Sequence, residues 1–65
     1  MDKIDEEILK IFLKKRRRLS SSKITKLLNE KKIEISRPTV TKRLIRLKKQ
    51  KWLVSAFKIN PDRLP

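Results

Sequence analysis

Apolar residues recur at helical spacing in three separate stretches of this chain, and this pattern constrains its fold more than any other feature. The three stripes are Ile4, Ile8, Leu9, Ile11 and Phe12, then Ile24, Leu27 and Leu28, and then Val40, Leu44 and Leu47. Residues at i, i+3, i+4 and i+7 share one face of an α-helix. Disordered basic tails lack such regular spacing, so we expect a folded and mainly helical chain.

Residues that can begin a helix stand just before each stripe. The candidate N-caps are Asp2, Ser20 and Ser36, whose side-chain oxygens can accept a hydrogen bond from the first helical turn. Apolar pairs flank the second and third caps in the manner of a hydrophobic staple, namely Leu19 with Ile24 and Ile35 with Val40. The signals together predict helices over about residues 2–15, 20–31 and 36–51.

Residues 52–59 change to a period of two and predict a β-strand. A strand cannot stand alone, and the candidate partners are residues 17–20 and 33–35, because no return strand is evident. Trp52 at the start of this segment is expected to lie in the core rather than to stack on a base. The predicted fold class is therefore mainly α with a small β component, in one domain spanning residues 1–65.

Positive charge dominates the composition. Twenty Lys and Arg against seven Asp and Glu give 65 residues a formal net charge of +13. Four of the acids lie within residues 1–7, where the helix dipole explains them, and the dipole also explains part of the basic run at residues 14–18. The excess charge indicates a polyanionic partner. Nucleic acid is favoured over a membrane surface, because a membrane-surface protein would need a continuous amphipathic helix and turn signals interrupt the helices of this chain.

Several residue types are missing, and their absence narrows the chemistry. The chain has no Cys, no His and no Gly, so it lacks thiolate ligands, the commonest general base and a glycine-rich phosphate loop. Its longest apolar stretches are three residues, far too short to span a membrane. We expect no enzymatic activity, metal, cofactor or membrane partner, no evident small-molecule effector, and a cytoplasmic, nucleoid-associated protein.

Two short helices followed by a third that is basic and capped indicate a helix-turn-helix, in which the third helix enters the DNA major groove. The candidates for base contact are Arg37, Pro38, Thr39, Thr41 and Lys42, and those for base or backbone contact are Arg43 and Arg46. The candidates for backbone contact are Arg16, Arg17, Arg18, Ser20, Ser21, Ser22, Lys23, Lys26, Ser36 and Lys58. Ile45 lies off the apolar stripe and is the candidate contact of a homodimer.

Three segments resemble one known family. Residues 5–12 are similar to the opening helix of the Lrp/AsnC transcription regulators, residues 36–44 to their recognition helix, and residues 57–64 to the strand and turn that leave their DNA-binding domain. The resemblance implies a winged helix-turn-helix with a short or reduced wing and a role in transcription regulation. MarR-like repressor domains share much of this pattern and are the second choice.

The chain also departs from that family. Its connection over residues 29–35 is longer, and Lys51 stands where a glycine is usual, so the third helix must end without a left-handed cap or with a strained one. The ligand-sensing and oligomerising domain of the family is not among these residues, so effector binding is not expected and dimerisation is not implied.

The function predicted first is sequence-specific binding of double-stranded DNA by a transcription regulator that binds as a homodimer. The alternative is an architectural or chromatin-type protein that coats duplex DNA with little sequence preference. An RNA-binding module would be expected to expose more aromatic residues. A protein-interaction adaptor would not need so basic a third helix.

Overall fold

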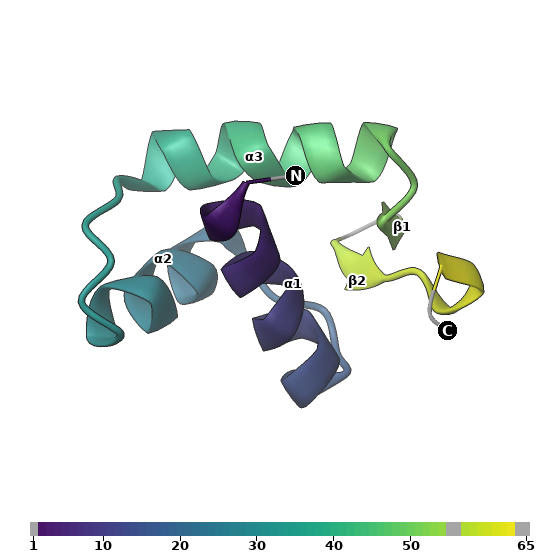
Figure 1. The fold of residues 1–65 in the computed structure, drawn as a ribbon, viewed down its shortest axis with the longest axis horizontal. Helices are drawn as coiled ribbons and strands as arrows, with labels where there is room; N and C mark the ends of the chain where they lie inside the picture. The colour runs from purple at the N-terminus through teal and green to yellow at the C-terminus, as the bar shows by residue number, and fades with distance from the viewer. Residues whose placement is uncertain (1, 55–56, 64–65) are drawn as a thin grey trace.

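The computed structural model describes residues 2–54 and 57–63, and it confirms a mainly α fold with a small β component. The elements in chain order are α1 (Lys3–Lys15), α2 (Ser21–Glu30), α3 (Arg37–Lys49), β1 (Leu53–Val54), β2 (Lys58–Ile59) and the 3-10 turn η1 (Pro61–Arg63). In Figure 1, α3 runs along one side of the molecule, α1 and α2 lie beneath it, and β1 and β2 lie below its C-terminal end. The arrangement is compatible with a helix-turn-helix followed by a short wing.

All three predicted N-caps are found at the predicted residues. Asp2 accepts a hydrogen bond from the backbone N–H of Asp5 (3.0 Å), and Ser20 accepts one from Lys23 (3.2 Å). Ser36 occupies the cap position of α3 but makes no side-chain cap bond, because its hydroxyl pairs with that of Thr39 instead (3.0 Å).

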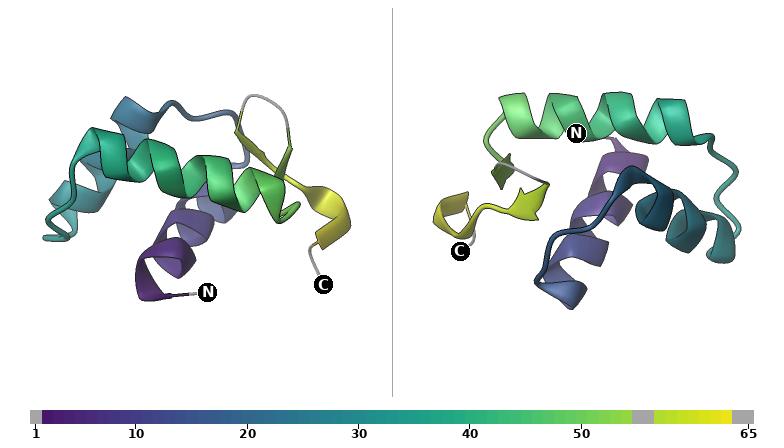
Figure 2. Two further views of the ribbon diagram at one scale, coloured as in Figure 1. Left: turned by 90° about the horizontal axis from the view of Figure 1, so that it is seen from above. Right: turned by 180° about the vertical axis from the view of Figure 1, so that it is seen from behind.

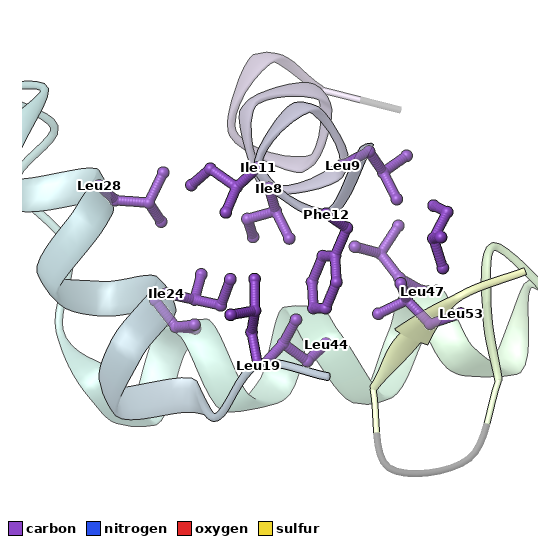
Figure 3. Packing of buried hydrophobic residues seen from close by; sticks show 12 residues of the cluster. Ile8, Leu9, Ile11, Phe12, Leu19, Ile24, Leu28, Leu44, Leu47 and Leu53 are labelled. Carbon is purple, nitrogen blue, oxygen red and sulfur yellow. The ribbon is translucent and has the colours of Figure 1, made fainter. Parts of the chain in front are cut away.

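The predicted apolar stripes meet in a single hydrophobic cluster, which Figure 3 shows around Phe12. The buried members are Ile8, Leu9, Ile11, Phe12, Leu19, Ile24, Leu28, Val40, Leu44, Leu47, Leu53 and Ile59. Leu19 and Ile24 of the first predicted staple are both buried in this cluster. Of the second staple, Val40 is buried in the cluster and Ile35 is half-buried against it. Burial of these side chains fixes α3 on α1 and α2 and leaves its opposite face in solvent.

Helix ends in this chain are built without glycine. Lys32 after α2 and Lys51 after α3 both have left-handed backbones, with φ of 65° and 69°. The next residue in each case donates its N–H to a carbonyl in the last helical turn: Ile33 to Leu28 and Trp52 to Leu47, both at 3.0 Å. This pattern is a Schellman motif, which normally has Gly at the left-handed position. Lys51 is thus the strained cap that the missing glycine predicted.

Replacing Lys51 by Gly should therefore stabilise the fold. A left-handed backbone at a non-glycine residue destabilises the folded state by about 1–2 kcal/mol. Glycine removes this strain, but its greater flexibility also stabilises the unfolded chain, so only part of the gain remains. We expect Lys51→Gly to raise the free energy of unfolding by roughly 0.5–1 kcal/mol in urea denaturation. The matched control, Lys49→Gly within α3, should lower it by about 1 kcal/mol. A loss of stability in both variants would contradict this account of the cap.

The single strand predicted over residues 52–59 is wrong. β1 and β2 pair with each other as an antiparallel hairpin, with Leu53 opposite Ile59 and Val54 opposite Lys58. Neither residues 17–20 nor residues 33–35 supply the partner. The chain reverses because Phe57, just before β2, adopts a left-handed backbone with φ of 52°, as the last residue of a three-residue hairpin connection commonly does. The alternation predicted for residues 55 and 56 lies outside the described residues.

Trp52 joins α3 to the hairpin and lies half-buried against the core, as expected. The guanidinium of Arg63 stacks over its ring, 4.1 Å from the ring centroid, in a cation–π contact. The tryptophan therefore fastens η1 to the end of α3, and one face of its ring is covered.

Candidate nucleic-acid interface

The exposed side of α3 is the most basic continuous surface that one element provides. We define the outer face of α3 as the exposed residues of this helix: Arg37, Pro38, Thr39, Lys42, Ile45, Arg46, Lys48 and Lys49. Five of these eight residues are cations, and α3 contains no acid. The three buried residues of α3 lie on its other side, which packs on α1 and α2, so these cations are left exposed.

Polar contacts organise the first turn of α3. Arg37 donates from Nε to the hydroxyl of Ser21 at the start of α2 (3.3 Å), which links the two helices of the pair. Thr41 is half-buried and donates its hydroxyl to the carbonyl of Arg37 (3.0 Å), so its methyl group is the part left for contact. Pro38 and Lys42 are exposed. The structure thus brings the five predicted base-contact residues together at the start of one helix.

The start of α2 adds hydroxyl groups next to this turn. Ser20 and Ser22 are exposed, Ser21 and Lys23 are half-buried, and Lys26 is exposed. Ser22 and Lys26 line an open depression of ≈ 560 Å³ together with Arg37, Thr25, Asn29 and Glu30. The predicted backbone-contact residues of α2 therefore lie beside the predicted base-contact residues of α3. The N-terminus of α2 also suits a phosphate group, because free N–H groups at a helix N-terminus favour anions.

A buried acidic residue of α1 pairs with two arginines of α3. Asp5 on α1 is 2% exposed, and its carboxylate accepts hydrogen bonds from Arg43 Nη1 (3.2 Å) and Arg46 Nη2 (2.6 Å). A buried carboxylate needs such partners, because an unpaired buried charge is strongly destabilising. Asp5 therefore fixes the start of α1 to the middle of α3.

Asp2 completes this cluster at the protein surface. Its carboxylate accepts a second bond from Arg43 Nη1 (2.6 Å). The hydrogen bond from the backbone N–H of Asp5, followed by that from Arg43, lowers the pKa of Asp2, and the bond to Asp2 raises the pKa of Arg43. A carboxyl whose pKa is lowered by folding adds stability above its unfolded pKa, and that contribution is lost as the pH falls through the folded pKa.

These contacts separate the two arginines predicted to reach bases or phosphates. The Arg43 side chain is only 22% exposed and is bonded to both acids, so it is occupied within the fold. Arg46 keeps 51% of its side chain exposed while it pairs with Asp5. Arg46 thus remains on the outer face of α3, whereas Arg43 has a structural role that the sequence interpretation did not include.

The remaining predicted backbone contacts lie elsewhere. α1 begins against α3 and ends on the far side of the molecule, so the segment carrying Arg16, Arg17 and Arg18 points away from the outer face of α3 (Figures 1 and 2). Lys58 is exposed on β2, which lies below the C-terminal end of α3 in Figure 1. The structure therefore groups the residues of α2 and α3 and keeps the end of α1, which Arg16 follows, away from them, whereas Arg18 stands two residues before Ser20.

Sequence reasoning missed Asp5 and Asp2 as partners of the α3 arginines. The helix dipole was a sufficient local reason for acids at the start of α1. A signal was nevertheless present, because Asp5 continues the apolar stripe at i−3 and i−7 from Ile8 and Phe12. A carboxylate on a buried stripe predicts a cationic partner from another element.

Comparisons with models of protein families, with curated proteins and with solved structures find no match for this chain. In the described part of the chain, no helix combines the length and apolar character needed to cross a membrane. Residues 2–54 and 57–63 also contain no cluster of three or more Asp and Glu side chains that could hold a metal ion. A functional assignment therefore depends on the charged surfaces described above.

Proposed function

We propose that this protein binds double-stranded DNA by inserting α3 into the major groove, and that it acts as a sequence-specific transcription regulator associated with the nucleoid. The observation that carries this proposal is the outer face of α3, where five exposed cations and no acid lie along one helix. The major groove is about 12 Å wide and admits an α-helix. Surfaces that serve only solubility usually mix both signs of charge.

The start of α3 supplies the groups that could distinguish bases. A guanidinium can pair bidentately with guanine, and a threonine methyl can contact the methyl group of thymine. Arg37 and Thr41 carry these groups in the first two turns of α3, next to the hydroxyl-rich start of α2, which suits phosphate. The resemblance of residues 36–44 to the Lrp/AsnC recognition helix supports the same orientation. The β1–β2 hairpin, with Lys58 exposed, would be the wing.

A second candidate is an architectural protein that binds duplex DNA without sequence preference. The specific observation in its favour is the occupation of Arg43 by Asp2 and Asp5, which leaves fewer guanidinium groups for reading bases. Lysines, which form the majority of the cations on the outer face of α3, act on phosphate mainly as point charges.

Arg37→Ala separates these two functions. If Arg37 reads a base, the substitution should cost about 1–3 kcal/mol of binding free energy on a duplex enriched from a random library and little on a scrambled duplex. Lys48→Ala is the control, because a phosphate contact should weaken both duplexes alike. Fluorescence anisotropy titrations measure both effects. An equal loss on the two duplexes for Arg37→Ala would contradict base reading and favour the architectural function.

A further inference from the structure

A second concentration of cations lies at the end of α1. We define the distal basic surface as Lys10, Lys14, Lys15, Arg16, Arg17, Arg18 and Lys31, all of which are exposed. Four of its lysines, Lys10, Lys14, Lys15 and Lys31, line a groove of ≈ 190 Å³ between α1 and α2, with Ile11 and Leu27. This groove joins the ends of α1 and α2 into one basic surface.

The distal basic surface and the outer face of α3 lie on different sides of the molecule. The Cα atoms extend over 30 × 21 × 20 Å. Figure 1 and the right-hand view of Figure 2 both show α3 along one edge and the end of α1 at the opposite edge. A duplex that takes α3 into its major groove therefore contacts the protein on the side away from the distal basic surface.

The charge of this surface is largely uncompensated. Glu7 is the acid that reaches it, and its carboxylate lies 3.7 Å from Lys10 Nζ and 3.9 Å from Lys31 Nζ. Within residues 2–54 and 57–63, no ion pair engages Lys14, Lys15, Arg17 or Arg18. A helix C-terminus favours one or two cations, but this surface continues through three arginines beyond the end of α1.

We propose that the distal basic surface binds the phosphate backbone of a second DNA duplex, so that one copy of the protein bridges two duplexes. This inference rests on the proposed binding of DNA by α3. A second copy of the chain does not fit here, because each copy carries a net charge of +13 and like charges repel. Among the residues that the structure describes, no aromatic side chain lines the groove. Single strands are bound largely by stacking on aromatic residues, so the double helix is the better partner.

The surface is suited to phosphate and not to sequence. Its lysines are exposed on flexible stems and its groove floor is apolar, so it offers charge without fixed donors aimed at base edges. The two duplexes are accordingly held in different ways, one by α3 in a groove and the other by its backbone.

A bridging assay tests the proposal. One duplex is fixed to beads, a second duplex with a fluorescent label is added, and the label recovered with the wild-type protein is measured. The distal variant is Lys14→Gln, Lys15→Gln and Arg17→Gln, which keeps Arg16 at the end of α1 and the lysines beside Glu7. The control variant is Lys3→Gln, Lys32→Gln and Lys51→Gln, which removes the same charge from residues outside both surfaces. Anisotropy on a single duplex is measured for all three proteins.

The proposal expects the wild type and the control variant to recover the labelled duplex and the distal variant to recover it about 10²-fold to 10³-fold less well, since that variant has lost three phosphate contacts of the second duplex. Single-duplex affinity should be the same for the distal and control variants. Equal recovery by those two variants would overturn the proposal, and would point to bridging through protein association. Single-duplex binding by the wild type without recovery of the second duplex would overturn bridging alone. Failure of the wild type to bind a single duplex would overturn the proposed function and bridging together.

Discussion

Asp5→Asn is expected to lower the free energy of unfolding by about 2 kcal/mol, because hydrogen bonds to charged groups contribute about 1.5–3 kcal/mol and the two arginine partners lose their buried counter-charge. The carboxylate of Asp5 is 2% exposed and accepts bonds from Arg43 and Arg46. Asparagine has nearly the same shape but carries no charge, and its NH₂ group cannot accept a bond from a guanidinium. In a domain of this size the loss corresponds to a fall in Tm of roughly 10 °C.

The control for this prediction is Asp2→Asn. Asp2 also contacts Arg43, but its side chain is 52% exposed, and asparagine serves equally well as an N-cap. We therefore expect a clearly smaller change in Tm than for Asp5→Asn, measured by circular dichroism in the same buffer. Equal losses in the two variants, or an unchanged Tm for Asp5→Asn, would show that the buried carboxylate does not hold α1 on α3.

Neutralising Lys42, Lys48 and Lys49 to Gln should abolish most of the DNA affinity. Each phosphate contact changes the slope of log affinity against log salt by about 0.9. Each contact therefore raises the affinity for DNA nearly tenfold when the salt concentration is lowered from about 1 M to about 0.1 M. The triple variant should bind about 10²-fold to 10³-fold more weakly at that salt concentration, with a slope shallower by about 3. All three lysines are exposed on the outer face of α3, so the fold should be unaffected.

The matched comparison uses the variant with Lys3, Lys32 and Lys51 changed to Gln, which has the same net charge. That variant loses long-range attraction to DNA but no contact of the outer face of α3, and we expect its salt slope to stay close to that of the wild type. If the two triple variants lose affinity and slope to the same extent, DNA responds to the total charge of the protein and α3 is not the interface.

The helices were predictable because their signals are local. Ser20 caps α2 and Leu19 is buried beside Ile24, as the order of polar and apolar residues indicated. The hairpin was not predictable in the same way. Its chain reversal depends on a left-handed backbone at Phe57, and without a glycine the sequence gives no sign of such a residue.

The candidate site was predictable only where one helix carries it. Arg37, Thr41 and Lys42 lie within the first two turns of α3. Their proximity could therefore be predicted from the helical period alone. The bonds of Arg43 and Arg46 to Asp5 join residues about 40 positions apart, and the place where α1 ends depends on how this helix packs against α3 (Figure 1). Both follow from the packing of one helix on another, which residue spacing along the chain does not reveal.

The central claim is that this protein binds duplex DNA through phosphate contacts made around α3. The most direct measurement is an anisotropy titration of the wild-type protein with a labelled duplex at a series of salt concentrations. Contacts with about six phosphates predict that log affinity falls linearly with log salt with a slope of about −5. A slope near zero, or no binding to duplex DNA at low salt, would contradict the account.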